Sequence, residues 1–196
     1  MKLHIGCFNV VLEGWYNTDI SIHLFIARVP LCATLLHTAG LMTDQSYGYH
    51  REGLFRRVHY LNAARRFPMA DDSIEAIYTS HLVGNFTRGV ALSCMKECHR
   101  VLKRGGVLRV ATPDLDAWVR EYDPMNPDRF LNLFYLPGVR GHKNLVKWVY
   151  NAHSLRALLK EAGFAEVTRC RMRKGRCPDV DRIDYREDSF FLEAVK

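Results

Sequence analysis

Short apolar runs alternate along this chain with longer segments in which apolar residues recur at helical spacing. A run of four to eight apolar or alternating residues predicts a strand, whereas recurrence every three or four positions predicts a helix that buries one face. A long helical pattern begins at Thr87 and carries Val90, Met95 and Cys98 on one face. The strands predicted in this way cover residues 3–6, 15–20, 57–61, 75–80, 107–111, 165–172 and 189–195, and the helices cover 22–41, 87–103, 115–122, 127–136 and 153–162.

Turn signals separate these elements. Pro30 predicts a break in the first helix, because proline cannot donate a helical hydrogen bond. Gly105, shortly after Lys103, is typical of a helix C-terminus. The remaining polar or turn-rich stretches, predicted to be loops, are 43–53, 70–73, 137–141 and 178–188.

The order of these elements predicts an α/β fold with a mostly parallel sheet covered by helices. Residues 7–14 separate the first two strands and are too few for a crossover helix, so the first crossover should be a loop or a single turn. The last two strands follow one another without a helix, which favours an antiparallel pair at one edge. We expect residues 1–196 to form one domain.

A glycine and an acidic residue mark the ends of the first two strands. Gly6 follows the first strand, and Asp19 ends the second. In doubly wound folds a glycine lets the backbone approach an adenosine-containing ligand, and a carboxylate at the end of the next strand accepts hydrogen bonds from the ribose. The sequence therefore predicts a cofactor site at this point. The alternative for Asp19 is a turn-forming aspartate.

Composition narrows the class of protein. With 196 residues, of which 48% are hydrophobic and 25% charged, the chain can bury a core without metals or disulfides. Six cysteines form no CxxC pair, so we expect reduced thiols and no metal site, although Cys94 and Cys98 share one helix. No run approaches a bilayer-spanning length and no signal peptide is evident, which predicts a cytoplasmic protein without a membrane partner.

The formal net charge of +7 favours acidic partners, among them nucleic acid. The alternative is a solvated basic surface that serves solubility alone. Two basic clusters stand out along the chain: Arg51, Arg56, Arg57, Arg65 and Arg66, and then Arg169, Arg171, Arg173, Lys174 and Arg176.

Several longer segments resemble a known family. They are the opening run Leu3–Cys7 with Asn17–Asp19, the run Phe67–His81, the run Glu97–Val110 with Pro113–Leu115, and the closing run Leu155–Phe164. Together they resemble the small class I S-adenosylmethionine-dependent methyltransferases, in particular short bacterial methyltransferase-domain proteins. The resemblance covers nearly the whole chain. It implies a three-layer αβα, Rossmann-like fold with seven strands, the last of them antiparallel.

The resemblance also implies where S-adenosylmethionine lies as cofactor. Gly6, Cys7 and the neighbouring Phe8 would line the methionine part, and Asp19 would hold the ribose hydroxyls. Asn62 would lie at the adenine edge, and Ser80 would border the methyl group. His142 and Tyr150 fall in the region where such folds carry an acceptor pocket.

The chain departs from the family pattern at three positions. Phe8 stands where a second glycine is usual, and Gly84 and Asn85 stand where a Glu-His pair is usual. A phenylalanine in this loop is unfavourable if its φ is positive. These departures keep a second hypothesis open, in which the protein is a methyltransferase-like binding or regulatory module without catalysis.

A hydroxyl acceptor needs a general base, and two residues are candidates. His81 follows the central strand on the ligand side, and its alternative is a structural histidine. Asp114 ends the fifth strand, and its alternative is an N-cap for the next helix. The favoured function is methyl transfer to a small-molecule or sugar hydroxyl, and a nucleic-acid methyltransferase is a third hypothesis. Sequence leaves the oligomeric state open.

Overall fold

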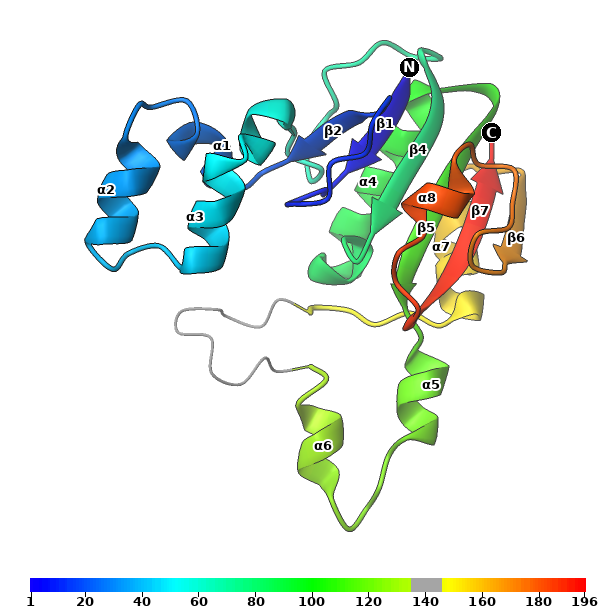
Figure 1. Ribbon diagram of the computed structural model, residues 1–196. Coiled ribbons are helices and arrows are strands. Elements are labelled where there is room, and N and C mark those ends of the chain that lie inside the picture. Colours follow the sequence, from blue (N-terminus) through cyan, green and yellow to red (C-terminus); the bar gives the residue numbers. More distant parts are fainter. Residues whose placement is uncertain (135–145) are drawn as a thin grey trace.

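The computed structural model describes residues 1–134 and 146–196, which contain a seven-stranded sheet (Figure 1). The strand order is β3-β2-β1-β4-β5-β7-β6, parallel except that β7 runs antiparallel to both β5 and β6. The strands are β1 (Lys2–Ile5), β2 (Tyr16–Asp19), β3 (His59–Tyr60), β4 (Ile74–Ser80), β5 (Leu102–Pro113), β6 (Glu166–Cys170) and β7 (Ser189–Val195). The α/β, Rossmann-like architecture with antiparallel final strands is confirmed.

Helices lie on both faces of the sheet and beside it (Figure 1). The α-helices are α1 (His23–Ile26), α2 (Cys32–Thr38), α3 (Asp44–Arg51), α4 (Arg88–Val101), α5 (Leu115–Arg120), α6 (Pro127–Leu131), α7 (Ala152–Glu161) and α8 (Val180–Ile183). Two 3₁₀ turns are η1 (Leu54–Arg57) and η2 (Val83–Asn85). The connection from β1 to β2 contains no helix, as its length predicts. Among the described residues, no helix is both long and apolar enough to cross a bilayer.

Side chains of β4 alternate between two cores on opposite faces of the sheet, because successive strand residues point to opposite sides. Ile77 packs in the main core, with Met95 of α4 and Leu158 of α7. Ala76 and Tyr78 pack in a smaller core, together with Trp15, Cys177 and Ile183. Cys94 and Cys98 are fully buried in the main core, where each acts as a small apolar side chain.

The segment between β2 and β3 forms a small helical insertion at the side of the sheet (Figure 1). A third cluster of buried residues anchors it: Cys7 after β1, Leu24 of α1, and Leu54, Phe55 and Val58 before β3. The helical pattern over 22–41 is interrupted between α1 and α2, near Pro30, as expected. Residue Cys7 therefore belongs both to the loop after β1 and to the anchor of the insertion.

Several expected boundaries are wrong. The stretch 43–53 contains helix α3, because Thr43 Oγ1 accepts a hydrogen bond from the amide of Ser46 at 3.3 Å and Asp44 and Arg51 suit the two ends of the helix dipole. The helix from Thr87 ends at Val101, because Leu102 is already extended and pairs with Ile74. Gly105 consequently lies within the range of β5, and the predicted loop 178–188 contains α8. Residues 137–141 and His142 lie outside the described residues.

Candidate functional site

The backbone turns sharply after β1, at Gly6. Its φ is +72°, a conformation that glycine adopts at little cost. The amides of Gly6 and Cys7 both donate to the carbonyl of Thr18 in β2, at 2.9 and 3.0 Å. A Cβ on Gly6 would lie 3.1 Å from the side chain of Leu82. Both the turn and the close approach of Leu82 therefore require a glycine here.

Asp19 holds this turn from the end of β2. Its Oδ2 accepts a hydrogen bond from the amide of Phe8 at 2.8 Å, and its Oδ1 accepts one from the amide of Ser21 at 2.8 Å. An ionised carboxylate has about four lone-pair sites, so two amides leave acceptor capacity for a ligand. The structure thus brings Gly6, Phe8 and Asp19 together at the carboxyl ends of β1 and β2.

Phe8 and Cys7 follow Gly6 and differ in exposure. Phe8 has φ +42°, a strained value for a residue with a side chain, and its ring is 42% exposed. That ring lies 6.1 Å from the ring of His23 and 6.0 Å from that of Phe55 in the helical insertion. Cys7 is buried, and burial, with a smaller effect of the Asp19 charge, raises the pKa of its thiol to about 12. Cys7 is therefore a neutral thiol and not a nucleophile.

The carboxyl end of β4 presents Ser80 and His81. Ser80 is buried, and its Oγ has no hydrogen-bond partner among the described residues. His81 has φ +53°, and its Nε2 lies 2.7 Å from Ser189 Oγ at the start of β7. Burial, and secondly the positive charge of Arg186, lower the pKa of His81 below its usual value, while Asp188 opposes them. The imidazole is therefore neutral at pH 7 and able to accept a proton.

A cavity of about 370 Å³ opens beside His81, at the carboxyl ends of β4 and β5. Val146, Trp148 and Val149 form one wall. The amides of Lys147 and Trp148 attach this segment to the carbonyl of Gly84 at 2.8 and 3.0 Å. A Cβ on Gly84 would lie 3.0 Å from the carbonyl oxygen of Trp148, so glycine allows this approach. Asn85 lines the cavity and donates from Nδ2 to the carbonyl of His81 at 3.2 Å. The two departures Gly84 and Asn85 thus shape this cavity.

The comparisons with known proteins identify the fold. Residues 39–110 match a family model described as a methyltransferase domain, which includes β3, β4, α4 and most of β5 but not Gly6 or Asp19. A SAM-dependent methyltransferase from Archaeoglobus fulgidus is 14% identical with a TM-score of 0.56, covering 100% of this chain and 85% of that one. A SAM-dependent methyltransferase from Thermotoga maritima is 16% identical with a TM-score of 0.53, covering 100% and 81%. The chain has the class I methyltransferase fold.

Other solved methyltransferases that match are longer than this chain. PigF, in a structure described as containing SAH, is 14% identical with a TM-score of 0.50, and the match covers 100% of this chain but 50% of PigF. No curated protein matches the chain in sequence. The expected resemblance to S-adenosylmethionine-dependent methyltransferases is confirmed at the level of the domain and the fold.

On this methyltransferase fold, Asp114 and Asn62 have local structural partners. Asp114 caps α5, because its Oδ1 accepts from the amide of Asp116 at 3.1 Å, and its Oδ2 lies 3.3 Å from Nη2 of Arg169. Asn62 Oδ1 accepts from the amide of Ala64 at 3.0 Å in the turn after β3. The N-cap alternative for Asp114 therefore accounts for Oδ1, and the ion pair with Arg169 accounts for Oδ2.

The predicted residues fall into two groups. Gly6, Phe8 and Asp19 are linked by the turn after β1, whereas His81 lines the cavity beside the cofactor edge of the methyltransferase fold. Tyr150 is buried in the main core instead of lining that cavity. Four residues of the His81 site were not predicted from the sequence: Trp118, Trp148, Arg186 and Ser189. No local motif marks Arg186 or Ser189, because only the antiparallel return of β7 brings them to β4.

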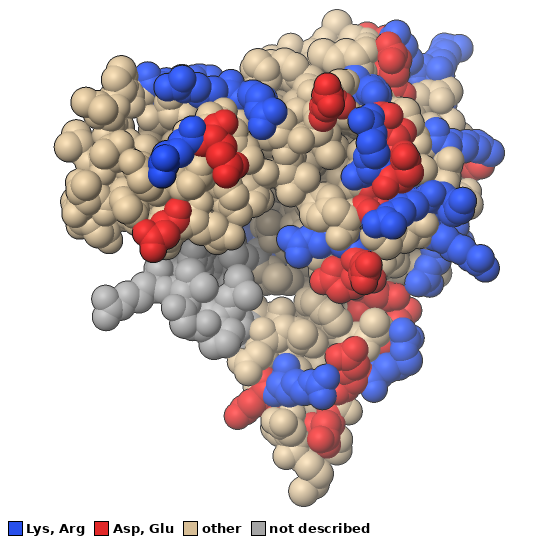
Figure 2. Space-filling model, viewed as in Figure 1, with Lys and Arg blue, Asp and Glu red and all other residues tan. Residues whose placement is uncertain are grey.

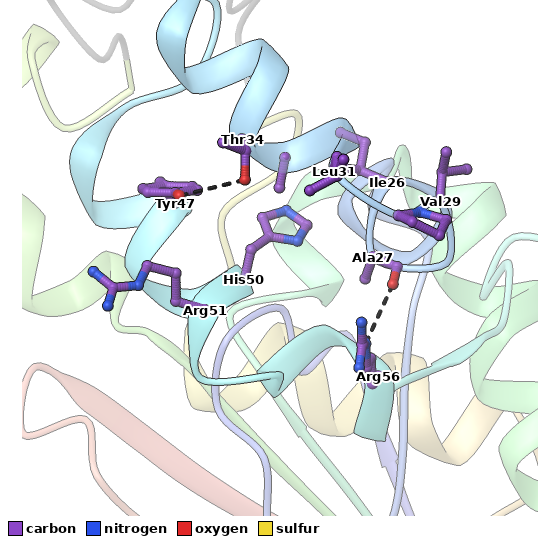
Figure 3. Close-up of a pocket in the computed structure, with 11 residues that line it drawn as sticks. Ile26, Ala27, Val29, Leu31, Thr34, Tyr47, His50, Arg51 and Arg56 are labelled. Atoms are coloured by element: carbon purple, nitrogen blue, oxygen red, sulfur yellow. Dashed lines mark hydrogen bonds between the residues drawn. The ribbon is translucent and has the colours of Figure 1, made fainter.

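A second cavity, of about 160 Å³, lies in the helical insertion (Figure 3). Figure 3 shows Ile26, Val29 and Leu31 on one side and His50 and Tyr47 on the other, with Tyr47 Oη 3.4 Å from Thr34 Oγ1. None of the predicted site residues lines it. It is therefore separate from the candidate catalytic region.

Acidic side chains lie among the basic ones at the surface, so fewer basic side chains are unpaired than the net charge suggests. Figure 2 shows Lys and Arg side chains interleaved with Asp and Glu over much of the visible face. In the second arginine cluster, Arg169 pairs with Asp114 and Arg176 lies 2.9 Å from Glu166. This pairing weakens the case for a continuous surface that binds nucleic acid.

Proposed function

We propose that this protein transfers a methyl group from S-adenosylmethionine to a hydroxyl group of a small molecule or sugar, and that residues 1–196 act as one domain. The observation that supports this most directly is the turn after β1, where the carboxylate of Asp19 accepts from the amide of Phe8 next to Gly6. This turn lies at the carboxyl ends of adjacent parallel strands, where open α/β sheets bind their ligands. The confirmed fold, and the SAH named in the description of the PigF structure, support the choice of ligand.

The residues present fit an adenosine-containing cofactor. The remaining lone pairs of Asp19 can accept hydrogen bonds from two ribose hydroxyls. The buried Oγ of Ser80 lacks a partner among the described residues, and a ligand can satisfy it. Gly6 and Cys7 would line the methionine part, and Asn62 would lie at the adenine edge. When bound, the sulfonium supplies the reactivity of the methyl group.

His81 is the proposed general base. Its lowered pKa leaves it neutral at pH 7, and Ser189 holds its Nε2, which leaves Nδ1 for the acceptor. His81 would take the proton that the acceptor hydroxyl gives up when its oxygen is methylated. The rest of the rate enhancement comes from holding the acceptor in line in a site that excludes water.

Binding of the demethylated product tests the proposal without a known acceptor. S-adenosylhomocysteine at 100 times its Kd should stabilise the protein by about 2.7 kcal/mol, which raises Tm by a few degrees in a domain of this size. Asp19→Asn should weaken the affinity about tenfold or more, since charge-assisted hydrogen bonds are the strong ones. Asp181→Asn, which removes a carboxylate from the exposed surface of α8, is the matched control. A protein that shows no shift at millimolar ligand contradicts the proposal.

Two features of the turn after β1 favour a second candidate, a methyltransferase-like binding module without catalysis. Leu82 packs against Gly6, and the strained Phe8 occupies the position of the usual second glycine. The cavity beside His81 is lined by neither Gly6 nor Asp19. In such a module the inherited cofactor site would be closed.

Phe8→Gly separates the two candidates. Glycine relaxes the positive φ and removes the ring from the turn. If Phe8 has degraded an inherited site, the affinity for S-adenosylhomocysteine, measured by calorimetry, rises in the variant. If it falls, Phe8 contributes to a reshaped pocket, and the active enzyme is favoured.

A further inference from the structure

The cavity beside His81 combines two indole rings with one cation. Trp118 comes from α5, Trp148 from the segment attached to Gly84, and Arg186 from the segment between α8 and β7. These three residues are far apart in the sequence and meet only in the folded chain. Their chemistry differs from that of the turn at Asp19, which offers a carboxylate and backbone amides.

Arg186 differs from many of the other arginines in its partners. Arg100, Arg109 and Arg169 each lie within 4.0 Å of a carboxylate. Arg186 makes no such ion pair with any described residue, and its guanidinium lies 5.6 Å from the ring of Tyr185. Asp188 is directed at the neighbouring His81, with 4.0 Å between Oδ1 and Nε2. At the exposed mouth of the cavity, Arg186 is therefore able to take an anionic group of a ligand.

The rest of the lining suits a ring with a hydroxyl group. Indole faces pack against aromatic rings and the apolar faces of sugars, and Trp148 is 45% exposed. His81, Asn85 and Thr112 add three polar side chains on the β4–β5 side. A cavity of about 370 Å³ is at the small end of the usual range for ligand sites and suits one substituted ring.

We infer that the methyl acceptor is a small ring compound that carries, besides its hydroxyl, one carboxylate or phosphate group held by Arg186. The inference rests on the proposed function. Arg186 binds the anion, the indoles of Trp118 and Trp148 contact the ring, and the hydroxyl faces His81. A single anion also orients the ring, because a guanidinium binds carboxylate or phosphate through two parallel hydrogen bonds.

Two matched pairs of probes test this with the full chain. They are 4-hydroxybenzoate with 4-hydroxybenzamide, and glucose 6-phosphate with glucose. Kd is measured by calorimetry, and quenching of tryptophan fluorescence reports contact with the cavity. The anionic member of at least one pair should bind tenfold tighter or more, which corresponds to about 1.4 kcal/mol. The pair that shows the preference distinguishes a carboxylate on an aromatic ring from a phosphate on a sugar.

Variants assign the preference to Arg186. Arg186→Gln should reduce it to twofold or less, and Arg186→Lys should retain part of it. Arg173→Gln removes the same charge from an exposed side chain outside the cavity and should leave the preference unchanged. Equal binding of both members of each pair, no binding of any probe, or a preference that survives in Arg186→Gln overturns the inference.

The same titrations with S-adenosylhomocysteine present separate this inference from the proposed function. If the nucleoside binds and no anion preference is found, the inference alone fails. If the preference is found and S-adenosylhomocysteine does not bind, the methyl-transfer proposal fails, while the anion site stands.

Discussion

At the scale of single residues, the chemistry of His81 depends on two charged neighbours of opposite sign. Arg186 lowers the pKa of His81 and Asp188 raises it, while burial has the largest effect and lowers it. A base acts only in its neutral form, so activity should rise with pH through this lowered pKa. The acid limb of kcat/KM should therefore have its midpoint below 6.5, the ordinary pKa of histidine.

Replacing Arg186 gives a direct test of this balance. In Arg186→Gln the positive charge is lost, so the pKa of His81 should rise, whereas in Asp188→Asn it should fall further. Titration of the His81 ring by NMR measures both shifts without an acceptor or a cofactor. Arg173→Gln again serves as the control for a general loss of charge. A His81 pKa that does not respond to either neighbour would contradict the placement of these side chains.

At the scale of elements, the pairing of β1 with β2 depends on a buried histidine. His4 is fully buried, and its Nδ1 lies 3.2 Å from Oδ1 of Asn17 in the neighbouring strand. Its Nε2 has no partner among the described residues, so a second proton there would remain unsatisfied. Burial lowers the pKa of His4 to about 4. The folded β1–β2 pair therefore requires a neutral imidazole.

This requirement makes stability depend on pH. The His4 side chain takes up its proton near pH 6.5 in the unfolded chain and near pH 4 in the folded chain. The free energy of unfolding is therefore highest above pH 6.5 and decreases as the pH falls from 6.5 to 4. The loss for one histidine amounts to about 3 kcal/mol. Urea unfolding of wild type and His4→Gln between pH 7 and 4.5 should show a shallower decline in the variant. His153→Gln, in an exposed position, should decline as steeply as wild type; a His4→Gln slope equal to wild type rules out the linkage.

Elements with strong local signals were predictable, and long-range features were not. Strand β7 spans the predicted residues, because the run from Phe190 to Val195 is apolar except for Glu193 and needs no tertiary information. Helix α3 was missed, since its polar sequence has no apolar stripe and its cap is the main local sign. Of the site, the turn at Gly6 and Asp19 was accessible from spacing alone. The role proposed for Arg186 could not be predicted, because it depends on the lack of an ion pair between Arg186 and any described carboxylate, which only the folded chain shows.

At the scale of the whole molecule, one buried arginine ties the C-terminal segment to the sheet. Arg109 of β5 is fully buried, with its Nε 2.8 Å from Oδ1 of Asp184 and its Nη1 2.7 Å from Oε1 of Glu193. The same carboxylates accept the amides of Arg173 at 2.6 Å and Cys177 at 3.0 Å. The segment from Arg173 to Asp184, which includes α8, is thereby fastened over the face of the sheet that carries the smaller core, and Arg186 follows shortly after it.

Arg109→Met should accordingly destabilise the whole fold. Removing the cation leaves two buried carboxylates without their partner, a change that costs about 3–5 kcal/mol. The free energy of unfolding should fall by that amount, seen as a lower urea midpoint at an unchanged slope. Arg104→Met, at an exposed position of the same strand, should have little effect. Combining Arg109→Met with Asp184→Asn and Glu193→Gln should restore part of the loss, because the uncompensated charges are then gone. If Arg109→Met alone costs less than about 1 kcal/mol, the figure for an ordinary surface pair, the C-terminal segment is held by its apolar contacts, and the position of Arg186 does not depend on this cluster.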